Sequence, residues 1–188
     1  TDDGYVTLVN ANVAEDGTVT ESAARTGTWA WRHPHGDGTV TYTLLQGDVR
    51  LTDVDFAYEE GKTVLHDVSV FAEPGQKVAF VGATGAGKTT MIKLLMRFYD
   101  VNSGAILIDG HNVKDFNRSE LRQMFGMVLQ DTWLFHGSIK DNIKYGKLDA
   151  TDEEVIEAAK AARVHRFVQT LPGGYDMELN EEASNVSQ

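Results

Sequence analysis

The residues best suited to chemistry lie in one glycine-rich stretch, Gly82-Ala83-Thr84-Gly85-Ala86-Gly87-Lys88-Thr89. The stretch fits G-x-x-x-x-G-K-[ST], a pattern that cradles phosphate groups. Glycines let the backbone wrap so tightly that successive N–H groups point at a phosphate. Lys88 is then placed to reach the β- and γ-phosphates, and the Thr89 hydroxyl to ligate Mg²⁺. We therefore predict a nucleoside triphosphate site, whose residues in this part of the chain are Gly82, Thr84, Gly85, Ala86, Gly87, Lys88, Thr89 and Thr90.

The same stretch could be a glycine-rich turn that binds nothing, but such a turn has no need of Lys88 and Thr89 at its end. A short apolar run, Lys77–Val81, precedes it as an expected strand, and an expected helix follows it. Strand, loop and helix together are the context that a phosphate loop requires. The loop alone does not separate GTPases, kinases, helicases and transport ATPases. The GTPase reading is weak, because in Asn112–Asp115 the lysine comes one place too late for the guanine-selecting pattern Asn-Lys-x-Asp.

Composition excludes several classes of protein. The 188 residues are 41% hydrophobic and include no cysteine, so the chain can bury a core without disulfides and has no thiolate metal site or cysteine nucleophile. No apolar run approaches the roughly 18 to 20 residues of a membrane-spanning helix, and we expect a soluble segment. The net charge is −11, with −4 in residues 1–46, −1 in 47–148 and −6 in 149–188. Such a chain offers no broad basic face, so we expect no nucleic-acid partner.

Residues 1–46 alternate short β-type runs with glycine turns. Asp16-Gly17 and Asp37-Gly38 are hairpin dipeptides that tolerate positive φ. We predict a small antiparallel β unit or a loosely ordered linker, with Trp29 and Trp31 on one face because residues i and i+2 share a face in a strand. The expected strands are Tyr5–Val9, Val19–Glu21, Thr28–Trp31 and Thr39–Leu44.

From Gly47 onward the pattern changes to strands separated by helices, which is typical of an α/β fold. The helix after the phosphate loop has an apolar stripe at i, i+3, i+4 and i+7, so it must pack on a sheet. Thr151 is the expected N-cap of a later helix whose first turn is acidic. The expected strands are Val49–Phe56, Val64–Phe71, Lys77–Val81, Ala105–Ile108 and Met127–Leu129, and the expected helices are Lys88–Phe98, Ser119–Phe125 and Asp152–Ala162.

Several sequence segments outside the phosphate loop, taken together and in order, indicate a family. They are Asp53–Tyr58, Thr63–Ser69, Val128–Asp131, Leu134–Ile143 and Glu181–Gln188. In this order they resemble the nucleotide-binding domain of ATP-binding cassette (ABC) transporters, particularly exporters in which the membrane helices and the ATPase are one polypeptide. The resemblance covers residues 47–188. It implies an incomplete P-loop NTPase core of the α/β class, preceded by residues 1–46 as a β-rich connector.

The resemblance also implies roles for single residues. Tyr58 stands where the family has an aromatic that stacks on adenine, although taken alone it would be a half-buried strand residue. Gln130 stands where a glutamine amide reaches Mg²⁺ and the attacking water, so Lys88 and Gln130 are the expected catalytic residues and Thr89 and Gln130 the expected metal ligands. The region Trp133-Phe135-His136 matches the surface that meets the coupling helices of the membrane domain. The alternative is that the rings of Trp133 and Phe135 fold back onto a local core.

The last residues resemble the approach to the family's signature sequence. Val186-Ser187-Gln188 would be its first three residues, and we expect the chain to be truncated there. In a head-to-tail dimer Ser187 of one domain would reach the γ-phosphate held by Lys88 of the other. The acidic Mg²⁺ contact, the general base and the γ-phosphate-sensing histidine of the family have no counterpart, and the strands that flank Lys77–Val81 are expected from sequence beyond Gln188. We therefore expect no ATP hydrolysis by residues 1–188 alone.

The function implied is that of the ATP-binding part of an ABC exporter, with ATP and Mg²⁺ as cofactors and a second nucleotide-binding domain and a membrane domain as partners. The expected location is the cytoplasmic side of the cell membrane. Two alternatives remain open. One is a stand-alone P-loop enzyme such as a small-molecule kinase. The other is a non-catalytic binding module in which the N-terminal β unit is the functional part.

Overall fold

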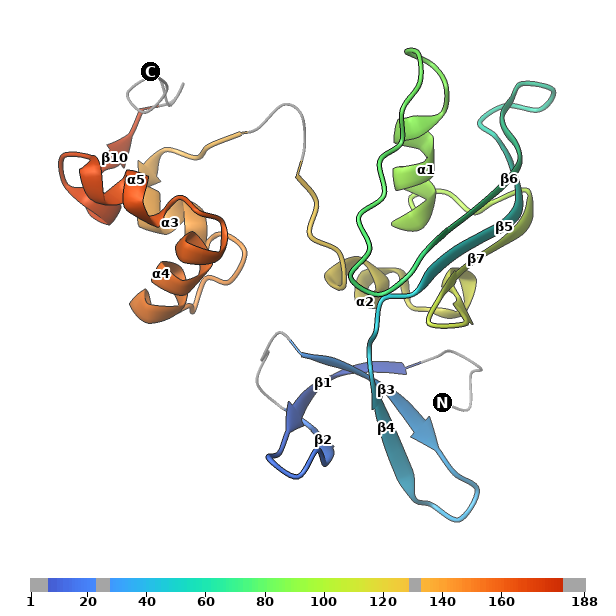
Figure 1. Cartoon of the computed structure of the whole chain (residues 1–188), viewed down its shortest axis with the longest axis horizontal. Helices are drawn as coiled ribbons and strands as arrows, with labels where there is room; N and C mark the ends of the chain where they lie inside the picture. Colours follow the sequence, from blue (N-terminus) through green and yellow to red (C-terminus); the bar gives the residue numbers. More distant parts are fainter. Residues whose placement is uncertain (1–6, 23–27, 129–132, 181–188) are drawn as a thin grey trace. The chain divides into compact units, whose positions relative to one another are not determined.

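The computed structural model describes residues 7–22, 28–128 and 133–180. The chain forms two compact units, Thr1–Gly126 and Met127–Gln188 (Figure 1). No helix in the described ranges is long and apolar enough to cross a membrane.

The first unit begins with a four-stranded antiparallel sheet. Its strands are β1 (Thr7–Val13), β2 (Val19–Glu21), β3 (Trp29–Pro34) and β4 (Val40–Leu44), in the order β2-β1-β3-β4. The predicted antiparallel unit in this segment is therefore confirmed. Trp31 is only 2% exposed, and Trp29 packs against the same hydrophobic core, as expected for residues two apart in a strand.

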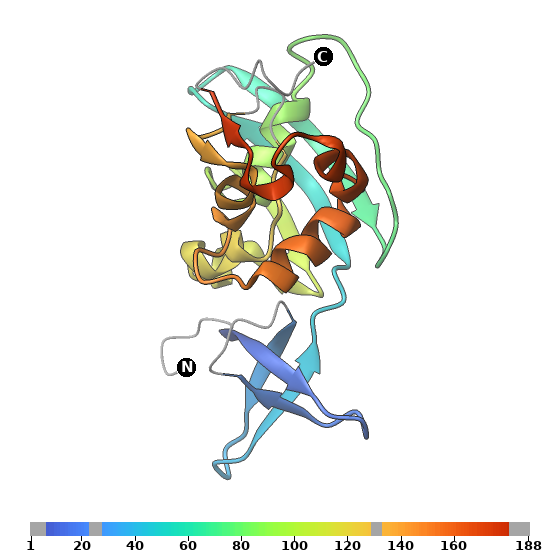
Figure 2. The ribbon, with the colours of Figure 1, turned by 90° about the vertical axis from the view of Figure 1, so that its left-hand side faces the viewer.

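A second four-stranded antiparallel sheet follows in the same unit. It contains β5 (Val49–Ala57), β6 (Thr63–Ala72), β7 (Ser103–Ile108) and β8 (His111–Asn112), in the order β6-β5-β7-β8. Figures 1 and 2 show that one extended stretch of chain joins the two sheets, between Leu44 and Val49. Tryptophan from the first sheet and aliphatic residues from the second belong to one buried cluster, so the two sheets share a core.

Three helical segments complete this unit: α1 (Lys88–Leu95), the 3₁₀ turn η1 (Val113–Asp115) and α2 (Arg118–Gln123). Met91 and Leu94 are the buried apolar residues of α1 and lie in the same cluster as Phe56 and Leu65 of the second sheet. The predicted packing of this helix on a sheet is confirmed. Helix α1 ends three residues before the expected Phe98, because Arg97 takes the left-handed conformation.

The second unit contains short elements. They are β9 (Gly137–Ser138), α3 (Ile139–Lys144), α4 (Asp152–Ala161), α5 (His165–Thr170), the 3₁₀ turn η2 (Gly174–Asp176) and β10 (Glu178–Leu179), and β9 pairs with β10 in antiparallel. Thr151 is the N-cap of α4 as predicted, and it forms a capping box with Glu154. Val155 and Ala159 are the buried residues of this helix.

Two predicted strands are not found. Residues 77–81 are not in a strand, and Val81 is 90% exposed. An apolar run becomes a strand only when a neighbour satisfies its backbone groups, and among the described residues no strand pairs with this one. The prediction for Met127–Leu129 is also wrong for Met127 and Val128, which lie outside any strand, whereas Leu129 lies outside the described residues.

Candidate nucleotide-binding site

The phosphate loop takes the backbone conformation for which its glycines are needed. Gly85 and Gly87 have φ values of 87° and 84°, in the left-handed region that residues with a side chain seldom adopt. Gly87 is also the N-cap of α1, and it is buried. A Cβ at this position would lie 2.6 Å from Cδ2 of Leu65. Gly87 is therefore required both for its φ and for the close approach of β6.

Lys88 folds back over the start of the loop. Its ammonium group donates hydrogen bonds to the carbonyl oxygens of Gly82 and Ala83, each over 2.7 Å. A turn between Ala86 N–H and the carbonyl oxygen of Ala83, at 3.2 Å, tightens the loop further. An ammonium group has three protons, so one remains for a phosphate oxygen while the other two hold the side chain over the loop.

The first turn of α1 supplies further donors at the same place. The first N–H groups of any helix have no intrahelical acceptor, and they carry the positive end of the helix dipole. In α1 these groups belong to Lys88, Thr89 and Thr90, directly after the glycines. Thr89 is exposed, whereas Thr90 is buried. The side chain of Thr89 is thus the hydroxyl that this helix offers to a ligand.

Tyr58 is fixed beside the same helix. Its hydroxyl shares a 3.1 Å hydrogen bond with the hydroxyl of Thr90. Its ring meets those of Phe56 and Tyr99 edge-on, at centroid distances of 4.8 and 5.0 Å. Lys93 of α1 lies 5.8 Å from the ring centroid. Tyr58 is still 45% exposed, so part of its surface remains open to a flat apolar ligand.

The strand β5, which ends directly before Tyr58, is tied to both of its neighbours by Asp55. The carboxylate accepts hydrogen bonds from the Ser103 hydroxyl at 2.7 Å, from the Asp67 backbone N–H at 2.8 Å and from His66 Nδ1 at 2.9 Å. These bonds, the one from Ser103 first, lower the pKa of Asp55 to about 2. Asp55 therefore stays ionised at neutral pH and links β5 to β6 and β7.

Sequence reasoning missed two members of this site, Tyr99 and Lys93. Tyr99 lies beyond the end of α1 and forms one wall of the aromatic cluster. Lys93 presents its charge to the Tyr58 ring. The only sequence signal was an aromatic pair, Phe98-Tyr99, directly after the helix. That signal does not reveal which of the two rings turns toward Tyr58.

The other expected site residues belong to the second unit, Met127–Gln188. Gln130 and Ser187 lie outside the described residues. Trp133 is 78% exposed in the second unit. Phe135 stacks on Tyr145 with ring centroids 4.4 Å apart, and Asn142 bonds to both backbone groups of Phe135. Phe135 therefore has local contacts, but it is 44% exposed and Tyr145 is 64% exposed, so neither ring belongs to a buried core.

The residues present fit a magnesium-bound triphosphate. The loop combines left-handed glycines, free helix N–H groups and an ammonium group, and Thr89 offers the hydroxyl oxygen that a hard cation such as Mg²⁺ accepts. No cluster of three or more His, Cys, Asp or Glu side chains among the described residues could hold a metal by itself. A cation at this site would therefore depend on the phosphates for most of its ligands.

Comparisons with known proteins agree with this site. The family model described as ABC transporter matches residues 65–188. The fatty acid ABC transporter ATP-binding/permease protein of Mycobacterium tuberculosis (strain CDC 1551 / Oshkosh) is 52% identical over 143 residues, which cover 76% of this chain and 23% of that protein. A putative multidrug export ATP-binding/permease protein of Staphylococcus aureus (strain NCTC 8325 / PS 47) is 47% identical over 154 residues, covering 81% and 27%.

A solved structure gives the same answer. A bacterial Atm1-family ABC exporter with ATP bound matches with a TM-score of 0.66 and 41% identity, over 74% of this chain and 25% of that one. The expected P-loop core of the α/β class is confirmed by these matches. The chain spans about a quarter of the length of the relatives it matches.

Proposed function

Because the chain belongs to the ABC transporter family, we propose that it supplies the ATP-binding part of an exporter that couples ATP binding and hydrolysis to transport across a membrane. The observation that carries this proposal is the phosphate loop, with the Lys88 ammonium group bonded to its first two carbonyl groups and the N-terminus of α1 at its end. Family members share this ATP-binding function, and the names of the matched relatives combine an ATP-binding part with a permease.

The nucleotide would be held at three points. Lys88 and the N–H groups of Gly85 to Thr90 bind the β- and γ-phosphates, and Thr89 contributes its hydroxyl to Mg²⁺. Tyr58 stacks on the adenine, which its exposed ring and fixed hydroxyl support. The bound Mg²⁺ supplies charge neutralisation for the transferring phosphoryl group. Gln130 is the proposed residue that orients the attacking water.

The proposed assembly has two further partners. A second nucleotide-binding domain would pair head to tail, so that Ser187 of one domain faces the γ-phosphate held by Lys88 of the other. The coupling helices of a membrane domain would meet the Trp133-Phe135-His136 region. The 78% exposure of Trp133 supports this, because a large exposed aromatic is typical of a contact surface. With these partners, the domain would lie on the cytoplasmic side of the membrane.

The domain boundary belongs to the same proposal. Residues 1–46 would form a β-rich connector, and residues 47–188 the first part of the nucleotide-binding domain. None of the connector residues that the structure describes, 7–22 and 28–46, has a recorded contact with the loop or the Tyr58 cluster. We expect ATP affinity to persist when residues 1–46 are removed; a large loss would mean that this segment completes the adenine pocket.

The test of the proposed function is ATP binding by the chain of residues 1–188, measured by isothermal calorimetry with Mg²⁺. Lys88→Ala should remove most of the affinity, because it removes the one lysine that lies over the loop entrance. Lys77→Ala is the matched control, since it removes an exposed lysine before the loop. Unchanged binding by Lys88→Ala would contradict the proposal, and so would binding of GTP in preference to ATP.

Hydrolysis by residues 1–188 alone is a separate matter. Phosphoryl transfer is catalysed mainly by positioning and by stabilisation of charge, and these residues hold the loop and Gln130 without a proposed general base. We propose that the chain binds ATP without turning it over. Phosphate release measured beside Lys88→Ala decides this, and turnover clearly above that variant would mean that another residue acts as the base. It would also favour a stand-alone enzyme such as a kinase.

A further inference from the structure

The P-loop helix α1 is followed, two residues after its end, by a residue in an unfavourable conformation. Arg97 has φ 51°, in the left-handed region where glycine is usual. The backbone bonds there are those of a Schellman motif: Arg97 N–H donates to the Leu94 carbonyl over 2.9 Å, and Phe98 N–H to the Lys93 carbonyl over 2.8 Å. A long side chain in this conformation costs free energy, so neighbouring contacts must hold it.

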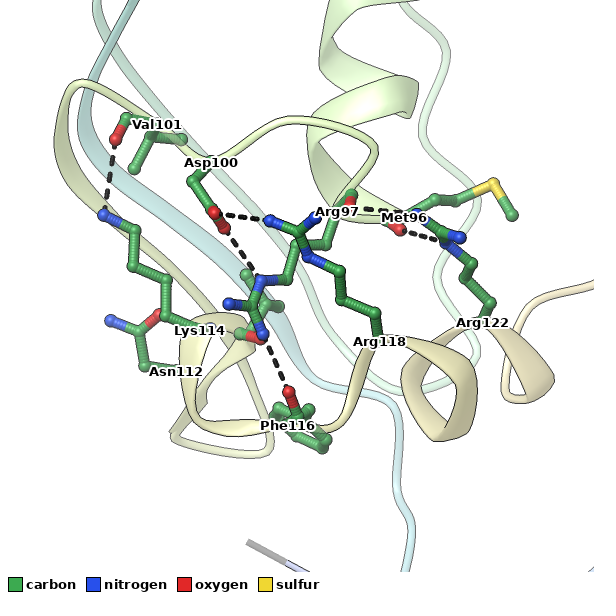
Figure 3. A network of polar contacts seen from close by, with 10 residues as sticks. Met96, Arg97, Asp100, Val101, Asn112, Lys114, Phe116, Arg118 and Arg122 are labelled. Carbon is green, nitrogen blue, oxygen red and sulfur yellow. Dashed lines mark hydrogen bonds and ion pairs between the residues drawn. The ribbon is translucent and has the colours of Figure 1, made fainter. Parts of the chain in front are cut away.

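Those contacts come first from the Arg97 side chain itself (Figure 3). Its guanidinium group donates to Asp100 Oδ1 over 2.8 Å and to the carbonyl oxygens of Phe116 and Val113 over 2.7 and 3.2 Å. Asp100 also pairs with Arg118 over 2.8 Å. Desolvation raises the pKa of Asp100, but the bonds and charges of the two arginines outweigh it and the pKa is lowered. Asp100 is therefore an anion that holds Arg97 in place.

The second set of contacts comes from Arg122 of α2. Its Nε donates to the Met96 carbonyl over 3.3 Å, and its Nη2 to the Arg97 carbonyl over 3.2 Å. The guanidinium group also lies 4.5 Å from the Phe98 ring centroid. Figure 3 shows this side chain reaching across from the ribbon of α2 to the end of α1. A cation there satisfies the carbonyl groups left free at the helix end and opposes the negative end of the helix dipole.

The two ends of α1 therefore have different contacts. The phosphate loop and Lys88 lie at its start, and the Arg122 contacts lie just past its end. The helix has only eight residues, so it is a short rod about 12 Å long. A tilt of such a rod at one end would change the direction of the N–H groups at the other. Arg122 therefore joins α2 to the helix that begins at the phosphate loop.

We propose that Arg122 is a positioning residue for ATP hydrolysis: bonded from α2 to the Met96 and Arg97 carbonyl groups just past the end of α1, it holds the P-loop helix, with Lys88 and Thr89 at its start, in the orientation that phosphoryl transfer requires. This inference rests on the proposed function. In the proposed function, Arg122 contacts neither the nucleotide nor the attacking water. Its loss should disturb the alignment of the reacting groups more than the binding of ATP, because tight binding tolerates small shifts and in-line attack does not.

The experiment measures kcat and KM for ATP in the complete transporter, purified with its membrane domain. Arg122→Met keeps the length of the side chain but not its donors, and should lower kcat about ten-fold or more, while KM changes less than about two-fold. Arg122→Lys keeps the charge but not the two-pronged geometry, and should recover part of kcat. Arg118→Met is the matched control, since Arg118 bonds to Asp100 but to no carbonyl of α1; its kcat should stay at the wild-type value.

The outcomes separate this inference from the proposed function. Wild-type turnover that does not depend on Lys88 would overturn the proposed function itself. Turnover that depends on Lys88 but is unchanged in Arg122→Met would overturn only the role of Arg122, and so would an equal loss in Arg118→Met or a loss confined to KM. If Arg122→Met melts at a lower temperature than the wild type, the Arg122→Lys variant distinguishes a positioning role from a general loss of stability. Wild-type kcat in Arg122→Lys would then overturn the role, and a reduced kcat at unchanged melting temperature and KM would support it.

Discussion

Trp31 donates its indole N–H to a carboxylate oxygen of Asp109 over 2.9 Å, although 78 residues separate the two in sequence. The same carboxylate accepts the backbone N–H groups of Gln46, Gly47 and Asp48 at 2.8, 2.9 and 2.8 Å. Each oxygen of Asp109 therefore accepts two hydrogen bonds. The Asp109 side chain, in the turn between β7 and β8, therefore binds both Trp31 of the first sheet and residues 46–48, which follow this sheet in the chain.

The ring of Trp31 strengthens the same junction. It packs on His111 and Phe116 with centroid distances of 4.5 and 5.3 Å, and Phe116 is fully buried. Phe116 in turn offers its carbonyl oxygen to Arg97 at the end of the P-loop helix. The N-terminal sheet is therefore continuous, through packed side chains, with the element that begins at the phosphate loop.

Asp109→Ala should lower the free energy of unfolding by about 2 to 4 kcal/mol, because four donors lose a charged acceptor and some become unsatisfied. Asp109 has φ 49°, so alanine adds backbone strain there. Asp109→Asn tolerates this conformation better and should be less damaging. Urea denaturation of the chain measures both, with the exposed Asp149→Ala as control. A loss in Asp109→Ala no greater than in the control would show that the junction does not depend on this carboxylate.

Local patterns were sufficient to predict some of this structure. The phosphate loop and the N-cap of α4 depend on residues within one short stretch, so Gly87, Lys88 and Thr151 could be assigned from spacing alone. The dipeptide Asp109-Gly110, of a type that favours tight turns, forms the turn between β7 and β8, where Ile108 pairs with His111. Its second role could not be predicted, because nothing near Asp109 in sequence indicates that Trp31 is its partner.

The incorrect strand predictions have the opposite cause. The apolar run Lys77–Val81 has the composition of a strand, but a strand is defined by its neighbours, and composition does not supply them. The end of α1 was placed too far along for a related reason. Apolar periodicity continues to Phe98, whereas the left-handed turn at Arg97 is held by Asp100, Val113 and Phe116, which periodicity cannot register.

Two glycines of the loop allow a matched test of close packing. Gly85 and Gly87 have nearly the same left-handed φ, but a Cβ at Gly85 would have nothing within 4 Å, whereas one at Gly87 would lie 2.6 Å from Leu65. Gly85→Ala should lower the free energy of unfolding by about 1 kcal/mol through backbone strain. Gly87→Ala should cost a further 1 to 3 kcal/mol, roughly, because Leu65 must move. Thermal melts compare the two, and equal losses would mean that Leu65 yields freely.

Tyr58 separates a ring effect from a hydroxyl effect. Tyr58→Ala should weaken ATP binding by about 1 to 2 kcal/mol, the scale of one aromatic contact. Tyr58→Phe keeps the ring and should bind ATP almost as tightly, while the loss of the bond to Thr90 lowers the free energy of unfolding by about 1 kcal/mol. Calorimetric titration and melting curves give the two quantities. Equal weakening of ATP binding by both variants would assign the effect to the hydroxyl and contradict stacking.

Asp55 makes a prediction about acid stability. Its pKa falls from 3.8 to about 2 on folding, chiefly through the Ser103 hydroxyl and then through the Asp67 N–H and His66. A carboxylate whose pKa is lowered by folding stabilises the folded state above its unfolded pKa, and this contribution is lost as the pH falls toward the folded pKa. Asp55→Asn should therefore be less stable than the wild type at pH 5, and the difference should shrink steadily between about pH 4 and pH 2.

The measurement for Asp55 is the urea midpoint of both proteins at a series of pH values, with Asp149→Asn as a control for the loss of one exposed carboxylate. Ser103→Ala should reduce the pH dependence of the wild type, because it removes the largest cause of the lowered pKa. The side chain of Asp55 is 39% exposed, so added salt should weaken the contribution of His66 more than that of the Ser103 and Asp67 hydrogen bonds. A difference between wild type and Asp55→Asn that stays constant down to pH 2 would show that the three bonds do not favour the ionised form. The contribution of Asp55 to the stability of β5, β6 and β7 would then come from packing and not from the charge of its carboxylate.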